Sequence, residues 1–167
     1  MGRSGKTVIC LDACVIGHVL VPEKSSAPIE DIEASKVITD RIIAGTLKGC
    51  SPSVMISETK WFIGRLFKES GPMYVEERAD EVEDLLPPTL GPSFKFIDVN
   101  FAIAALATDF RFQYYAKSNP FSYNDGIYLA TASITGCEAL ITTDTHLLAT
   151  KEVLVLRPSA FLARYKV

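Results

Sequence analysis

The sequence predicts an α/β fold in which a mostly parallel sheet is connected by helical crossovers. Short apolar segments alternate along the chain with longer segments whose apolar residues recur at helical spacing. Two of the apolar segments, 7–11 and 139–143, lead directly into an aspartate. Parallel strands end at the same edge of a sheet, so both carboxylates should lie where open α/β folds bind their ligands.

The first half of the chain predicts two strands and three helices. Pro22 and the polar residues after it end the first helix, and isoleucines at helical spacing, such as Ile38 and Ile42, indicate the second. Ser57 is a candidate N-cap for the third. The predicted elements are a strand at 7–11, a helix at 14–20, a helix at 29–45, a strand at 53–56 and a helix at 58–69.

The second half continues the alternation of helices and strands. Paired prolines at 87–88 end an acidic helix, alternating residues indicate the next strand, and Gly136 ends the last long helix. The predicted elements, in chain order, are a helix at 74–86, a strand at 94–99, helices at 101–116 and 125–135, a strand at 139–143, a short helical piece and a strand at 153–156.

Composition indicates one globular domain over residues 1–167. Hydrophobic residues make up 48% and charged residues 22%, and no apolar run is long enough to span a membrane. The apolar run near the N-terminus stops at Asp12, so we expect no secretory signal and a cytoplasmic protein. The four cysteines show no C-x-x-C spacing, which favours reduced thiols over a zinc site.

The net charge of −3 argues against a protein that coats nucleic acid by charge alone. Four of the acidic residues are candidate metal ligands, and without them the remaining chain is slightly positive. Nucleic acid therefore stays open as a substrate.

Those four candidates, Asp12, Glu58, Asp125 and Asp144, each lie at the edge of an apolar run. Taken singly, Asp12, Glu58 and Asp125 are each explained more simply as a helix cap or a partner of a helix dipole. Together they favour a shared acidic site, in which carboxylates would repel one another unless cations lay between them. A hard divalent cation with oxygen ligands is the natural counterion, and such cations suit phosphate chemistry.

Other residues could contact a nucleic acid, but simpler interpretations compete. Lys60 and Arg65 share the helix of Glu58 and could bind phosphate, although a solvated helix face is the more common explanation for such residues. The aromatic residues that could stack on bases, with core packing as the simpler interpretation, are Tyr114, Tyr115, Phe121 and Tyr123.

Four segments, in order along the chain, resemble the motifs of the PIN domain, a nuclease fold shared by many toxins of the VapC type. Residues 8–13 are similar to the first strand and first acid of the family, and 52–58 to the second strand and the helix with the family glutamate. Residues 124–132 resemble the motif in which an aspartate opens a helix ending in Ala-Thr-Ala. Residues 140–144 match the Thr-x-Asp ending of the fourth strand.

The resemblance implies a three-layer α/β/α sandwich with a sheet of four or five strands, and a ribonuclease that uses Mg²⁺ or Mn²⁺. It implies that Asp12 and Asp125 bind metal directly and that Asp144 binds it directly or through water. Glu58 would bind metal or deprotonate the attacking water, and Thr142 would orient a neighbouring carboxylate.

The same resemblance implies an RNA substrate, a homodimer and, for a toxin of a toxin–antitoxin pair, a small antitoxin partner. Relative to a compact toxin the chain has extra residues near 22–30 and 70–95. Ala13 and Cys14 replace the hydroxyl or amide residues often found after the first acid, so we expect a hydrogen bond there to be lost.

Two alternatives stay open. A catalytically quiet PIN-like module that binds RNA or protein would be consistent with Ala13 and Cys14. A phosphatase of the haloacid-dehalogenase type also has an aspartate after its first strand, but it usually needs a second aspartate where this chain has Cys14.

Overall fold

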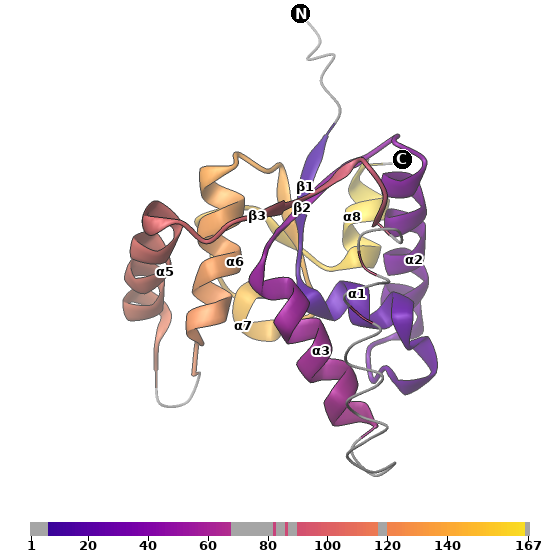
Figure 1. The fold of residues 1–167 in the computed structure, drawn as a ribbon, viewed down its shortest axis with the longest axis horizontal. Coiled ribbons are helices and arrows are strands. Elements are labelled where there is room, and N and C mark those ends of the chain that lie inside the picture. Colours follow the sequence, from indigo (N-terminus) through magenta and orange to yellow (C-terminus); the bar gives the residue numbers. More distant parts are fainter. Residues whose placement is uncertain (1–6, 68–81, 83–85, 87–89, 117–119, 166–167) are drawn as a thin grey trace, which may run out of the picture.

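In the computed structural model, which describes residues 7–67, 82, 86, 90–116 and 120–165, a parallel sheet lies between layers of helices (Figure 1). Within these residues the strands are β1 (Val8–Leu11), β2 (Lys48–Pro52), β3 (Phe94–Ile97), β4 (Ala139–Ile141) and β5 (Val155–Leu156), in the order β3-β2-β1-β4-β5. Every strand pair is parallel. The predicted α/β sandwich is confirmed.

Helices cover both faces of the sheet. On one side α6 packs on the sheet and α5 packs on α6, while α1, α2 and α8 lie on the other side (Figure 1). The helices are α1 (Ala13–Leu20), α2 (Ile29–Ile43), α3 (Val54–Leu66), α5 (Phe101–Tyr114), α6 (Tyr123–Ile134), α7 (Thr145–Leu148) and α8 (Pro158–Tyr165), with a short 3₁₀ turn at Pro22–Lys24.

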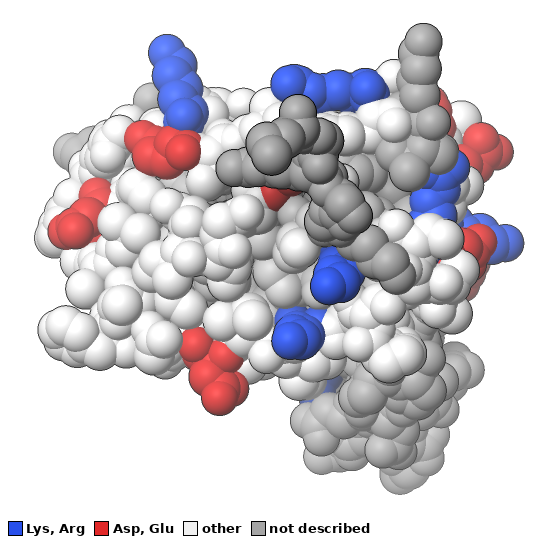
Figure 2. Space-filling model, turned by 90° about the horizontal axis from the view of Figure 1, so that it is seen from above, with Lys and Arg blue, Asp and Glu red and all other residues white. Residues whose placement is uncertain are grey.

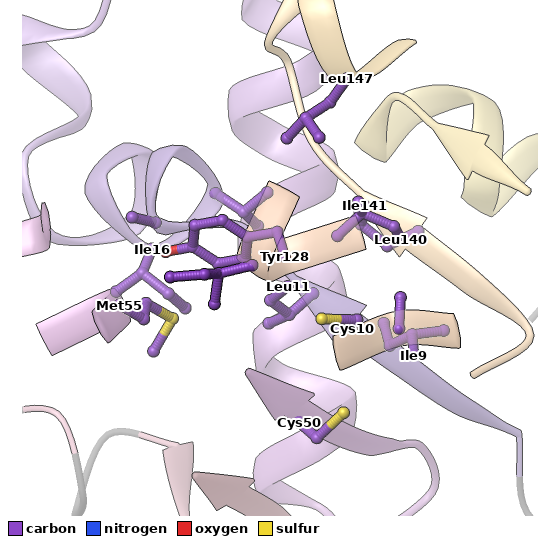
Figure 3. Packing of buried hydrophobic residues seen from close by; sticks show 14 of the residues in the cluster. Ile9, Cys10, Leu11, Ile16, Cys50, Met55, Tyr128, Leu140, Ile141 and Leu147 are labelled. Atoms are coloured by element: carbon purple, nitrogen blue, oxygen red, sulfur yellow. The ribbon is translucent and has the colours of Figure 1, made fainter. Parts of the chain in front are cut away.

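The middle strand β1 is the centre of the hydrophobic core. Ile9, Cys10 and Leu11 have no exposed surface, as expected of a strand covered by helices on both faces. Their side chains meet residues of β4, α1, α3 and α6 (Figure 3). In the register of β1 and β4, Leu11 pairs with Ile141. The residues that follow these two strands therefore emerge side by side.

The predicted strand at 53–56 is wrong, because the second strand is β2 at Lys48–Pro52 and α3 begins at Val54. Gly49 and Ser51 weaken the strand signal, yet both serve the sheet. A Cβ on Gly49 would lie 2.6 Å from the Phe94 ring of β3, and the Ser51 hydroxyl donates to the Leu11 carbonyl at 2.7 Å. Ser57, the expected N-cap, lies inside the helix.

The other predicted elements that can be compared agree with the structure to within a few residues. The predicted helix at 74–86 lies, except for residues 82 and 86, outside the described residues. Helix α8 at the C-terminal end was not predicted. It packs on α2, on the face of the sheet opposite α6 (Figure 1).

The four cysteines are free, as expected, although the Sγ atoms of Cys50 and Cys137 lie only 3.3 Å apart. Among the described helices, none combines the length and apolar character that crossing a bilayer requires.

Candidate active site

The four predicted acids line one open cleft of about 630 Å³ at the carboxyl edge of the sheet. Asp12 follows β1 and Asp144 follows the neighbouring β4, so the register of the two strands brings them to the same edge. Glu58 reaches the cleft from α3, and Asp125 from the first turn of α6. Four segments that are distant in the sequence thus contribute one carboxylate each.

Asp12 is held in place by side chains rather than acting as a helix cap. It occupies the N-cap position of α1 but makes no capping hydrogen bond. Its Oδ2 instead accepts from the Thr142 hydroxyl at 2.5 Å, and Thr142 in turn accepts from the Asp144 amide at 2.9 Å. Thr142 is therefore hydrogen-bonded to a neighbouring carboxylate, the contact that its predicted orienting role requires.

Cys14 keeps a contact that the sequence led us to expect would be lost. Its thiol donates to Asp12 Oδ2 at 3.1 Å, and its sulfur accepts from the Thr143 amide at 3.3 Å. The thiol is a weak donor, but α1 places it directly beside the carboxylate, so proximity compensates for the weaker group.

Asp125 and Asp144 each cap a helix with one oxygen. Asp125 Oδ2 accepts from the Ser122 amide at 2.6 Å in a capping box that begins α6. Asp144 Oδ1 accepts from the His146 amide at 2.6 Å and the Leu147 amide at 3.3 Å at the start of α7. Among the described residues, the second oxygen of each carboxylate accepts no hydrogen bond. The capping interpretation is thus correct for Asp125, and Asp144 also caps a helix. One oxygen of each carboxylate remains available.

Glu58 is positioned by the close approach of α3 to α1 and by a residue of α6. A Cβ on Gly17 of α1 would lie 2.6 Å from the Phe62 ring of α3, so a larger residue at this position would force the ring to shift. The Asn124 side-chain amide donates to Glu58 Oε1 at 2.7 Å. Because α3 begins at Val54, Glu58 lies beyond the first turn and is not a dipole-stabilised cap.

Burial and mutual repulsion disfavour the charged forms of these acids. Burial raises the pKa of Asp12 to about 6, aided by the charges of Glu58 and Asp144 and opposed by the hydrogen bonds of Thr142 and Cys14. Burial likewise raises the pKa of Glu58 and of Asp125, and the charge of Asp144 adds to both shifts. The cleft therefore has an unbalanced negative potential that a cation would relieve.

Tyr128, which sequence reasoning missed, lies close to the acids. Within the described residues its hydroxyl makes no hydrogen bond of good geometry, but it interacts with Glu58 and lowers the pKa of that carboxyl. Its side chain is only 1% exposed (Figure 3), and burial, with the charges of Asp12 and Glu58, raises the pKa of its hydroxyl well above the ordinary value. The hydroxyl therefore stays protonated beside two carboxylates. Its position one helical turn after Asp125 is a signal that could have been read from the sequence.

The other residues that line the cleft include aromatic and basic side chains. Trp61, Phe62 and Arg65 of α3 line it, and Arg157 lines it from the segment before α8. His18 of α1 also lines it, hydrogen-bonded through Nε2 to the Thr143 hydroxyl at 3.1 Å and through Nδ1 to the Ser25 hydroxyl at 2.8 Å. Burial lowers the pKa of His18. Helical spacing from Glu58 could have identified Trp61 and Arg65 together, whereas no local pattern marks Arg157.

His146 and several of the candidates for contact with a nucleic acid do not line the cleft. His146 lies on α7 with Nδ1 3.9 Å from Asp144 Oδ1, but it is not among the lining residues. Phe121 is buried and packs on Tyr114 at a ring-centroid distance of 5.5 Å, which favours the core interpretation for both. The other candidates for contact with a nucleic acid that do not line the cleft are Lys60, Tyr115 and Tyr123.

The donor set suits a hard divalent cation by its chemistry. Within the part of the chain that the structure describes, no three acidic, histidine or cysteine side chains already close on a single point that could hold an ion. Mg²⁺ commonly keeps several waters and takes only one or two carboxylates from the protein. Aspartates with one unengaged oxygen each, lining one open cleft, match that requirement.

An acidic cleft at the carboxyl edge of a parallel α/β sheet, supplied by four separate elements, defines the class of protein. The sequence matches the PIN domain family over residues 9–153, and the chain belongs to this family. PIN domains are generally nucleases.

Solved structures of PIN toxins share the fold. FitAcB from Neisseria gonorrhoeae is 20% identical, with a TM-score of 0.59 over 90% of this chain and 97% of that chain. VapBC2 from Rickettsia felis, bound to a DNA fragment from its promoter, is 11% identical, with a TM-score of 0.58 over 90% and 98%. VapC20 from Mycobacterium tuberculosis, a sarcin-ricin loop cleaving toxin, is 14% identical, with a TM-score of 0.54 over 87% and 98%. No curated protein matches the sequence.

Proposed function

We propose that this PIN domain is a metal-dependent endoribonuclease that hydrolyses RNA phosphodiester bonds. The observation that carries the proposal is the convergence of Asp12, Glu58, Asp125 and Asp144 in one cleft. The three aspartates each keep one oxygen free of hydrogen bonds with the described residues. Membership of the PIN family supports nuclease chemistry over a phosphatase.

Asp12, Asp125 and Asp144 would hold Mg²⁺ or Mn²⁺ through their unengaged oxygens, directly or through water. A bound ion of this kind polarises a phosphoryl oxygen and makes a bound water a stronger nucleophile. Thr142 and Cys14 fix Asp12 so that its free oxygen keeps one orientation. Charge repulsion among the acids falls when a cation enters, which favours binding to this cleft over the rest of the surface.

Glu58 is the residue that we expect to accept the proton of the attacking water. Burial raises the pKa of its carboxyl, which makes it a better base than an exposed glutamate. The Asn124 amide holds Oε1 and so aims the side chain into the cleft.

The test compares Asp12→Asn and Asp125→Asn with Asp109→Asn, a change of an exposed acid on α5, in cleavage of defined RNAs with and without chelator. We expect the first two to abolish metal-dependent cleavage and the third to leave it unchanged. Glu58→Gln should reduce the rate by about 10²- to 10⁴-fold, as loss of a general base does. Circular dichroism checks that the variants fold.

Full activity of Asp12→Asn or Asp125→Asn would refute the assignment. If calorimetry also detected no binding of Mn²⁺ to the wild-type protein, the chain would be the alternative, a catalytically quiet PIN-like module that binds RNA or protein.

We further propose that the chain is the toxin of a toxin–antitoxin pair and forms a homodimer. The fold neighbours support this, because FitAB and VapBC2 are both two-component assemblies that were solved bound to DNA. A small antitoxin would cover the acidic cleft, and pull-down after co-expression with the adjacent reading frame would recover it.

A further inference from the structure

Helix α3 presents a stripe of chemically distinct residues to the cleft. Glu58, Trp61, Phe62 and Arg65 recur at helical spacing and all line the cleft, so they share one face of α3. The acid at the start of the stripe belongs to the proposed metal site. The aromatic and basic residues that follow it have no part in that site.

Trp61 differs from Phe62 in how it is used. Phe62 packs against Gly17 and joins α3 to α1. Trp61 is 72% exposed and contributes nothing to the core. An indole is among the largest apolar groups in a protein and is usually well buried, so one left open beside an acidic site calls for an explanation beyond packing.

Arg157 lines the same cleft from outside α3, as a cation held by hydrogen bonding. Its Nη1 donates to Asp31 Oδ2 at 3.0 Å, and the buried Asp31 also accepts from the Ser159 amide at 3.2 Å and hydroxyl at 2.5 Å. These bonds tie the arginine to α2 and limit its freedom. A guanidinium has five N–H donors, and among the described residues the others have no partner, so they remain available to a ligand in the cleft.

We propose that Trp61, Arg65 and Arg157 form a subsite for an unpaired nucleotide beside the acids, with the indole stacking on the base and the guanidinium groups binding flanking phosphates. The charges complement a polynucleotide: phosphates meet the arginines, and a base meets the π-face. A base inside a duplex has both faces covered by its neighbours, so the subsite selects single-stranded segments. The inference rests on the proposed function, but its contacts require neither metal nor catalysis.

The chain offers a direct probe, because Trp61 is its single tryptophan. Emission excited selectively from tryptophan therefore reports on this residue alone. The titration uses the Asp125→Asn variant in millimolar Ca²⁺, so that the RNA is not consumed. Its three ligands are a single-stranded RNA of mixed sequence, the same strand with abasic sites, and the fully paired duplex. We expect strong quenching by the first and little by the other two.

Affinity is then measured in the same background by anisotropy of a labelled strand. Trp61→Ala should weaken binding about tenfold or more, in line with the loss of one stacked base, whereas Trp61→Phe should keep most of the affinity. Phe101→Ala is the matched control, because Phe101 is 89% exposed on α5 and does not line the cleft. Arg157→Lys should weaken binding of the normal and the abasic strand equally, since it loses a phosphate contact and not a base contact.

Unchanged emission at saturating RNA, or equal quenching by the abasic strand, would overturn the subsite. A change in emission produced only by a protein partner would also overturn it, by assigning Trp61 to a protein interface. Cleavage assays decide the proposed nuclease function separately. If cleavage failed while Trp61 still bound unpaired RNA, the subsite would stand and the nuclease assignment would fall.

Discussion

Asp12 is the most buried of the cleft acids, with 8% of its surface exposed, and its protonation should control the stability of the metal-free protein. Its pKa is raised from 3.8 to about 6, chiefly by burial. Below pH 3.8 the carboxyl is protonated in both the folded and the unfolded state. Between pH 3.8 and about 6 the folded protein keeps a proton on Asp12 that the unfolded chain loses. The stability that Asp12 contributes is therefore present at low pH and is lost as pH rises through 6, by about 3 kcal/mol.

Asp12→Asn should accordingly stabilise the metal-free protein at neutral pH. We expect the free energy of unfolding to rise by about 1–3 kcal/mol at pH 8, and by little near pH 4, where Asp12 is already neutral. Urea unfolding in chelator at the two pH values measures this. Added Mn²⁺ should stabilise the wild-type protein and have a smaller effect on the variant. An Asn variant that is less stable at both pH values would show that the cleft favours the carboxylate without metal.

Sequence patterns identified the cleft acids better than their supporting residues. Asp12 and Asp144 follow strands and Asp125 lies in the first turn of a helix, so their places at the sheet edge could be read locally. Glu58 lies inside α3, and the resemblance to the family motif identified it although the predicted start of that helix was wrong. Asn124 acts through the way α6 lies beside α3, and Arg157 acts through its bond to Asp31 on α2. Such relations depend on packing between distant elements, which no local spacing encodes.

The packing of α5 on α6 sets where Asp125 lies, and Gly126 is the residue that allows it. A Cβ on Gly126 would lie 2.5 Å from the carbonyl oxygen of Ala107 in α5. This oxygen is a backbone atom, so no side-chain rotation can relieve the contact. The two helices therefore approach more closely than any larger residue would permit. Because Asp125 precedes this glycine in α6, the distance between the two helices also sets the position of its carboxylate.

Gly126→Ala should destabilise the fold despite the higher helix propensity of alanine. Alanine would gain about 1 kcal/mol in an open helix, but overpacking typically costs about 1–3 kcal/mol, so we expect a net loss. Thermal unfolding compares it with Ser133→Ala, an exposed change in the same helix that should stay within about 0.5 kcal/mol of wild type. A Gly126→Ala variant more stable than wild type would contradict this prediction, because it would show that α5 can shift away from α6 at little cost.

At the level of elements, the helices were predicted more accurately than the second strand. Strand β2 has the sequence Lys-Gly-Cys-Ser-Pro, which lacks an apolar run because its burial depends on a glycine contact with Phe94 and a serine bond to β1. The apolar residues after it, Val54–Ile56, belong to the first turn of α3. Periodicity over so few residues could not separate a buried strand from a buried helix start.

The whole molecule has a net charge of −3, so the proposed RNA substrate would be bound locally and not by a broad basic surface. The face seen from above, where the N-terminal end of β1 lies, shows Lys and Arg interspersed with Asp and Glu and no continuous basic patch among the residues that are coloured (Figure 2). The cations that line the cleft are Arg65 and Arg157. Association should therefore release few counterions.

This predicts a shallow salt dependence for the binding of single-stranded RNA. With two phosphate contacts, the slope of log affinity against log salt should be about −1.4, and Arg157→Lys should change it only slightly because the charge is kept. Arg65→Gln should reduce its magnitude by about 0.7, whereas Arg164→Gln, at an exposed arginine outside the cleft, should not alter it. The anisotropy titration from about 50 to 200 mM salt gives all four slopes. A wild-type slope near −4 would require several additional phosphate contacts and would place the main RNA-binding surface outside the cleft.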